Sequence, residues 1–210
     1  MTTLNELINS RRSIRKYTGV VPPEACLHDM IRAAIKAPSP SNRQPVRFIR
    51  LQSATVGKNL QEAMIFGRER LMHSIENTAT PKRLRNWINA YFRFSEFMFE
   101  APVLLAVGAS ATSLSLAERF PGAESSGRAE GRRRDLDISI GLALMAYLLK
   151  GEELGLGSCV LTAPLFFIEE PEKIISLDKI DIRCFVTSGY PDEEPATIRR
   201  KSFAEMYRVV

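Results

Sequence analysis

Residues 137–149 constrain the fold most, because wound as a helix they would be apolar on nearly every side. Such a helix has no face suited to water, so it must be covered all round by its own domain or by another subunit. Its apolar run, IGLALMAYLL, is too short to span a bilayer. The sequence therefore predicts a substantial globular core and no membrane partner.

The remaining patterns predict one domain, residues 1–210, that mixes helices and strands in an α+β or α/β fold. A capping box, Thr3 with Glu6, opens a short first helix. Further helices are expected over residues 21–38, 56–77 and 81–100, and strands over 46–52, 101–109 and 182–191. Residues 110–135 should form an exposed excursion, 155–164 a turn out of the apolar helix, and 190–210 an extended C-terminal tail.

The composition argues against several kinds of active site. A net charge of +5 permits anionic ligands without requiring nucleic acid. The three cysteines are far apart, so neither a disulfide framework nor a zinc site is expected, and a reducing cytoplasm suits them best. The first ten residues lack the apolar core of a secretion signal. With only two histidines, a Ser-His-Asp triad or a His-ligated metal is disfavoured, and an enzyme of this kind would rely on a bound cofactor.

The sequence RRSIRKY, residues 11–17, is a candidate anion site. It places Ser13 between Arg12 and Arg15, and guanidinium and hydroxyl groups together suit a phosphate. In an extended segment Arg11, Ser13 and Arg15 would point to the same side. Taken alone, the run is equally consistent with a solvated basic face.

Other segments offer polar, basic or flat surfaces to a ligand. APSPSNRQP, residues 37–45, holds amide and hydroxyl side chains in a loop stiffened by proline. In GLGSCVLTA, residues 155–163, glycines would let the backbone approach a flat ring. RRK, residues 199–201, is a second cationic cluster. The aromatic side chains of residues 81–100 would border a flat ligand or pack in the core or an interface.

The segments follow one another in a fixed order: RRSIRKY, a helix, APSPSNRQP, an apolar strand, the apolar helix, GLGS and the basic tail. In this order they resemble the nitroreductase family of FMN-dependent oxidoreductases. The resemblance covers nearly the whole chain and is weakest over residues 53–100 and 110–135. It implies an α+β fold with a mixed central sheet flanked by helices, in an intertwined homodimer with FMN at the dimer interface. Neither a metal nor a catalytic side chain is implied.

The resemblance also implies which residues bind the cofactor. The phosphate and nearby ribityl oxygens would be held by Arg11, Arg12, Ser13 and Arg15. A loop reaching the flavin from the partner subunit would supply Pro38, Ser39, Pro40, Ser41, Asn42 and Gln44. The ring near N5 would meet Leu161, Thr162 and Ala163, and the tail would return Arg199 or Arg200 to the phosphate.

Three positions depart from the family pattern. Val46 stands where family members often carry Trp, and Pro40 where a small flexible residue is usual. Pro164 stands in place of a glycine pair and has no N–H to offer flavin N5.

The family's activity implies a ping-pong cycle in which NAD(P)H gives hydride to flavin N5 and an oxidised acceptor, such as a nitroaromatic or quinone, then takes the electrons. GRRRD, residues 131–135, would lie at the pocket mouth and favour an anionic donor or acceptor, or belong to a solvated loop. Alternatives are a specialised relative, namely a reductive dehalogenase, a flavin-destroying enzyme or a dehydrogenase, and a non-catalytic flavin-binding sensor. A nucleic-acid-binding module is disfavoured, because no recognised motif is present. The physiological substrate and the choice between NADH and NADPH stay open.

Overall fold

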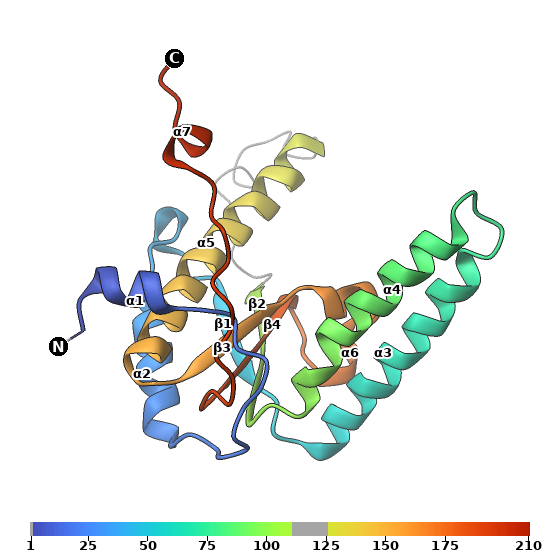
Figure 1. Ribbon diagram of the computed structural model, residues 1–210, viewed down its shortest axis with the longest axis horizontal. Coiled ribbons are helices and arrows are strands. Elements are labelled where there is room, and N and C mark those ends of the chain that lie inside the picture. Colours follow the sequence, from blue (N-terminus) through green and yellow to red (C-terminus); the bar gives the residue numbers. More distant parts are fainter. Residues whose placement is uncertain (1, 111–125) are drawn as a thin grey trace.

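A four-stranded sheet in the order β1-β2-β4-β3 lies at the centre of the fold (Figure 1). The computed structural model describes residues 2–110 and 126–210. Strands β2 (Val103–Ser110) and β4 (Ile180–Gly189) occupy the middle of the sheet. Strands β1 (Val46–Arg50) and β3 (Gly157–Leu161) lie outside them, and all three pairings are antiparallel.

The basic segment near the N-terminus adds a short edge beside β3. Ser13 bridges Ser158 in the parallel sense. The four strands thus form an antiparallel sheet within the expected α+β fold, and the parallel contact of the described residues with it is this isolated bridge. Gly157 permits the close approach, because a Cβ there would lie 2.4 Å from Cγ1 of Ile14.

Helices α2 (Glu24–Ile35) and α5 (Ser126–Glu153) cover one face of the sheet. Alternate side chains of β2, such as Leu105 and Val107, point to this face, as the two-residue period of a strand requires. The short helix α1 (Leu4–Ser10) contacts α5 and opens with the expected capping box. The helix side of this core contains Leu27, Met30, Ala34, Ile140, Ala143, Leu144 and Tyr147.

The opposite face is covered by α3 (Ala54–Ser74) and α4 (Pro81–Glu96), a long hairpin that projects beyond the sheet (Figure 1). Three short elements complete this side: η2 (Phe97–Phe99), η4 (Ala163–Phe166) and α6 (Pro171–Ile175). The core here contains Leu60, Met64, Phe92, Met98, Leu104, Ala106, Cys159, Leu161, Phe167 and Phe185.

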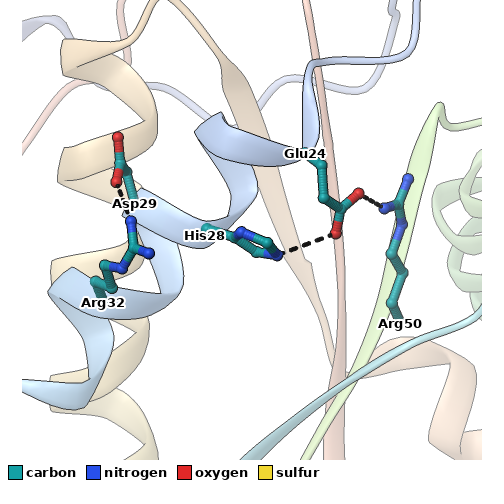
Figure 2. Close-up of polar contacts among 5 residues, drawn as sticks. All are labelled: Glu24, His28, Asp29, Arg32 and Arg50. Carbon is teal, nitrogen blue, oxygen red and sulfur yellow. Dashed lines mark hydrogen bonds and ion pairs between the residues drawn. The ribbon is translucent and has the colours of Figure 1, made fainter.

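A surface cluster of charged residues joins α2 to β1 (Figure 2). The Glu24 carboxylate pairs with the Arg50 guanidinium and lies 3.5 Å from Nε2 of His28. One turn further along α2, Arg32 donates to Asp29 at 3.0 Å. His28 is exposed and belongs to this surface cluster.

Two sequence expectations about elements were wrong. Helix α5 begins at Ser126 instead of residue 137, so residues 126–135 form its first turns; arginine is a strong helix former and extends the apolar segment backwards. Residues 111–125, the rest of the expected excursion, lie outside the described residues. The second error concerns residues 157–161, which form β3 instead of a turn; they pair with β4, and four of the five residues are buried.

Two of the apolar surfaces that the described residues expose to solvent bear on assembly. One is a stripe on α5, where Ile138, Leu142 and Met145 are all more than 40% exposed. The other is the C-terminal tail, which leaves the body of the fold and ends beyond α7 (Phe203–Met206) (Figure 1). Among the helices of residues 2–110 and 126–210, none has the length and apolarity needed to cross a bilayer.

Candidate functional site

The basic segment lies along β3 and is held there by its backbone. The N–H of Ile14 donates to the carbonyl of Ser158 at 3.1 Å, and Ile14 is buried against Gly157. Because the side chains of an extended segment alternate, burial of Ile14 leaves the side chains of Ser13 and Arg15 on the other side. The extended conformation expected from the sequence is therefore present.

Arg11, Ser13 and Arg15 act together on the thiol of Cys159 in β3. Burial raises the pKa of this thiol, while the charge of Arg15, a hydrogen bond from Ser13 and the charge of Arg11 oppose the rise. Two cationic side chains and a hydroxyl are thus close enough to this part of β3 to act on its thiol. Charge-assisted hydrogen bonds from such a group suit a phosphate better than any neutral ligand.

Arg12 has a different local role from its neighbours. Its guanidinium donates to the carbonyls of Asn9 at 2.6 Å and of Ser10 at 3.3 Å, near the C-terminal end of α1. It also donates to its neighbour's carbonyl, that of Arg11, at 2.9 Å. A cation here complements the negative end of the helix and caps free carbonyls.

The start of the C-terminal tail is bound to the same segment. The carboxylate of Glu193 accepts the N–H of Arg15 at 2.5 Å and that of Lys16 at 3.1 Å. The N–H of Asp192 donates to the carbonyl of Lys16 at 3.0 Å. The first residues of the tail are therefore fixed at the edge of the candidate anion site.

A buried network of hydroxyl groups, which was not predicted from the sequence, holds the basic segment against the sheet. The hydroxyl of Tyr17 donates to the carbonyl of Ile14 at 2.6 Å and accepts from Thr187 at 2.7 Å. Burial raises the pKa of Tyr17 well above its usual value. Thr187 is fully buried and directly follows the apolar run of residues 184–186, and a polar residue after such a run was the available signal.

A second set of hydroxyls lies on the α5 side of the sheet. Ser188 is within 3.0 Å of the Tyr147 hydroxyl and 2.9 Å of the Ser158 hydroxyl. Burial raises the pKa of Tyr147 to about 12, so the phenol stays protonated and can donate. These bonds fix β3, β4 and α5 together beneath the basic segment.

The predicted ring segment follows directly on β3. Leu161 is the last residue of the strand and is buried, Thr162 is exposed, and Ala163 opens η4. From Cys159 to Leu161, where the strand ends, the chain covers about 7 Å. The predicted phosphate side chains thus lie beside β3, and the predicted ring segment follows at the end of the same strand.

The loop of residues 38–44 has a strained backbone. Ser41, Asn42 and Gln44 have φ of 52°, 52° and 50°, in the left-handed region that non-glycine residues rarely adopt. The N–H of Gln44 donates to Oγ of Ser39 at 2.9 Å, and its side-chain amide donates to Oδ1 of Asn42 at 3.0 Å. Pro38, Ser39 and Gln44 also border a cavity of about 370 Å³ between α2, α5 and β1. Strain that the surroundings maintain is frequent in ligand-binding loops.

This loop lies at the opposite corner of the sheet from the basic segment. Ser13 is level with Val103 at the start of β2, whereas Val46 pairs with Ala109 near its end. The two segments are four strand spacings apart across the sheet and six residues apart along it, a separation on the order of 25 Å. One copy of the chain does not bring both to one ligand.

The remaining candidates lie on the tail and on α4. Arg199 and Arg200 are exposed, beyond the part of the tail that Glu193 holds. On α4 the structure divides the aromatic side chains, since Phe92 packs in the core while Trp87 is exposed. Among residues 2–110 and 126–210, no cluster of His, Cys, Asp and Glu could hold a metal ion.

Comparison with known proteins places this arrangement in a family. A model described as "Nitroreductase family" matches residues 8–190. The putative NAD(P)H nitroreductase YfhC of Bacillus subtilis (strain 168) is 26% identical over 208 residues, covering 98% of this chain and 93% of the relative. The iodotyrosine deiodinase of Thermotoga neapolitana is 25% identical over 197 residues, covering 92% and 91%.

Solved structures share the fold. A BluB-like flavoprotein from Clostridium difficile 630 has a TM-score of 0.84 at 20% identity, with both chains fully covered. Oxidized iodotyrosine deiodinase bound to FMN and 3-iodo-L-tyrosine has a TM-score of 0.66 at 25% identity, covering 96% of this chain and 97% of that one. Since the family model spans most of the sequence, the chain belongs to the nitroreductase family.

Proposed function

We propose that this chain is an FMN-dependent oxidoreductase that uses NAD(P)H to reduce an oxidised small molecule such as a nitroaromatic or a quinone. The observation that carries the proposal is that the basic segment of Arg11, Ser13 and Arg15 lies beside β3, and that Thr162 and Ala163 follow at the end of the same strand. It is supported by membership of the nitroreductase family and by the FMN held in the iodotyrosine deiodinase structure.

The donor groups of the β3 edge fit FMN. Two guanidinium groups and a hydroxyl match a terminal phosphate, with Arg12 completing the basic segment from the end of α1. A ribityl chain would follow β3 from the phosphate to the end of the strand at Leu161, where Thr162 and Ala163 would meet the ring. Pro164 is buried and has no N–H, which leaves the N–H groups of Thr162 and Ala163 as the donors at the ring edge.

FMN held by these residues would supply the redox chemistry, which is transfer of a hydride equivalent from NAD(P)H and then of its two electrons to the acceptor in a ping-pong cycle. The residues contribute position and charge. Arg11 and Arg15 stabilise negative charge on the cofactor, and the amides of residues 162 and 163 do so at the ring. Both histidines lie elsewhere, on helices, beside Glu24 and Glu76. Arg133 and Arg134, exposed on α5, would favour an anionic donor or acceptor.

The active form in this proposal is a homodimer. The strained loop of residues 38–44 reaches the flavin of the partner, because in its own copy it lies at the far corner of the sheet. Arg199 or Arg200, on the C-terminal tail, contacts an FMN phosphate in the same dimer. The open stripe of Ile138, Leu142 and Met145 on α5 supplies an apolar interface.

The test begins with the cofactor of the purified protein. Heat release and chromatography should give FMN, and steady-state kinetics with NAD(P)H and a quinone should show parallel double-reciprocal lines. Arg11→Ala should weaken FMN binding about tenfold or more, since one charge-assisted contact contributes about 1.5–3 kcal/mol. Arg32→Ala removes an exposed arginine of α2 and should bind FMN as the unaltered chain does. Stoichiometric FAD, or no flavin after incubation with FMN, would contradict the proposal.

Reductive dehalogenation is a second candidate, favoured by the similarity to iodotyrosine deiodinase over most of both chains. It would use the same phosphate and ring contacts with a halogenated aromatic acceptor. Iodide release from 3-iodo-L-tyrosine by the chemically reduced protein distinguishes the two. Iodide release that is faster than the reduction of a quinone by the same reduced protein would favour the dehalogenase.

A further inference from the structure

Three aromatic rings outside the core form a continuous ladder between α4 and η4. The ring centroids of Trp87 and Tyr91 are 5.6 Å apart, and those of Tyr91 and Phe166 are 5.9 Å apart with the rings nearly perpendicular. These side chains are 61%, 40% and 64% exposed. Each ring carries a large apolar area, so three in contact at the surface mark a binding site more often than isolated apolar residues do.

The ladder ends at the segment proposed to contact the flavin ring. Phe166 is the last residue of η4, which begins at Ala163 and packs against α4. At about 2.0 Å per residue in a 3-10 helix, Phe166 lies roughly 6 Å further along the axis than Ala163. The ladder therefore reaches to within about 6 Å of the segment proposed to contact the flavin ring.

The same face of α4 carries a cation beyond the rings. Arg83 precedes Trp87 by four residues, as Trp87 precedes Tyr91, and residues four apart are neighbours on a helix. Arg83 is exposed, at the end of the ladder far from η4. Arg93, six residues after Trp87, is exposed on another side of the helix and provides a matched comparison.

We propose that Trp87, Tyr91 and Phe166 form a specificity wall for planar aromatic acceptors, and that Arg83 selects those that carry an anionic group. The inference rests on the proposed flavin function, whose site it extends. Stacking on the rings rejects aliphatic molecules of similar size, and the guanidinium pairs with a carboxylate or an equivalent anion. The wall belongs to the same copy of the chain as Thr162 and Ala163.

Trp87 is the single tryptophan of the chain, so its fluorescence reports directly on the wall. Benzoate, titrated into the full-length protein with and without added FMN, should quench this emission in a saturable way. Cyclohexanecarboxylate has the same charge and a similar size but no aromatic ring, and should bind at least about tenfold more weakly. Equal binding of the two carboxylates would overturn the proposal.

Three variants test the wall and its cation separately. Arg83→Gln should weaken benzoate binding about tenfold and Tyr91→Leu, next to Trp87 in the ladder, several-fold, while Arg93→Gln should bind as the unaltered chain does. Equal effects of the two arginine variants would refute the role of Arg83. If the Trp87 emission changes with protein concentration and not with benzoate concentration, the rings lie in an interface between copies. That result would overturn the proposal. The benzoate titration needs no turnover. A protein that binds benzoate as expected but binds no FMN would therefore contradict the proposed function and not the aromatic wall.

Discussion

At the scale of single residues, Gly157 has the greatest influence on the candidate site. A Cβ at this position would meet Ile14 at 2.4 Å, which a real contact does not tolerate. Any side chain there must push the segment of Arg11, Ser13 and Arg15 away from β3. The glycine is therefore explained by close packing beneath the anion site, and its sequence neighbours give no hint of that role.

Gly157→Ala should lower FMN affinity at least about tenfold while leaving most of the helical content in place. The reason is displacement of the phosphate donors, each of which contributes about 1.5–3 kcal/mol. Gly57→Ala is the control, because a Cβ on Gly57 in α3 meets nothing within 4 Å. That variant should keep FMN affinity and gain up to about 1 kcal/mol in helix stability. Equal FMN binding by both variants, measured by flavin fluorescence, would contradict the role of close packing at Gly157.

The buried thiol of Cys184 makes stability depend on pH. Burial raises its pKa from 9.0 to about 12, so between these values the folded chain keeps a proton that the unfolded chain has lost. The free energy of unfolding should therefore fall as pH rises through this window. Urea unfolding at pH 8, 9.5 and 10.5 should show the decline, and Cys184→Ala should make it less steep by up to about 1.4 kcal/mol per pH unit. Parallel pH profiles for the two proteins would show that this thiol does not contribute.

At the scale of elements, helices and strands with a clear periodicity were predictable and the site's supporting structure was not. The patterns of residues 46–52, 56–77 and 101–109 correspond to β1, α3 and β2. The start of α5 was missed, because its first turns are polar and basic and show no apolar face. Strand β3 was missed, because its glycines resemble a turn, and only the bridge to Ser13 shows why they are needed.

The candidate site was partly predictable for a related reason. Residues 11–15 lie beside β3 and residues 162 and 163 follow at its end, and the alternation of an extended segment made the position of Ser13 and Arg15 predictable. The roles of Tyr17 and Thr187 depend on pairing between segments 170 residues apart, which one sequence does not encode locally. The division of the α4 aromatics into core and surface also depends on the position of η4.

The exposed stripe on α5 gives a prediction about assembly. Leu142→Arg places a charge in the centre of this stripe, where Leu142 is 44% exposed in a single copy. If the stripe is the dimer interface, light scattering should give a mass near 23.6 kDa instead of twice that value, and flavin should be lost. Val20→Arg, at an exposed valine of the loop before α2, should leave the mass of the dimer unchanged. A flavin-loaded dimer of Leu142→Arg would exclude the stripe as an interface.

At the scale of the whole molecule, the sheet separates the two halves of the proposed site. The basic segment and the strained loop lie at opposite corners, on the order of 25 Å apart. A two-fold axis that pairs one corner with the other corner of the partner would complete two equal sites at once. The apolar stripe and the exposed tail offer the contacts that such an arrangement needs.

The most direct test of this shared site is complementation between two defective variants. Arg11→Ala with Arg15→Ala removes phosphate donors, and Ser39→Ala with Asn42→Ala removes the hydrogen bonds that hold the loop. Each homodimer should bind little FMN. A heterodimer of the two, isolated with a different affinity tag on each chain, has one intact site and should bind about one FMN per dimer. A heterodimer that binds no more FMN than its parent homodimers would contradict a site built from two copies.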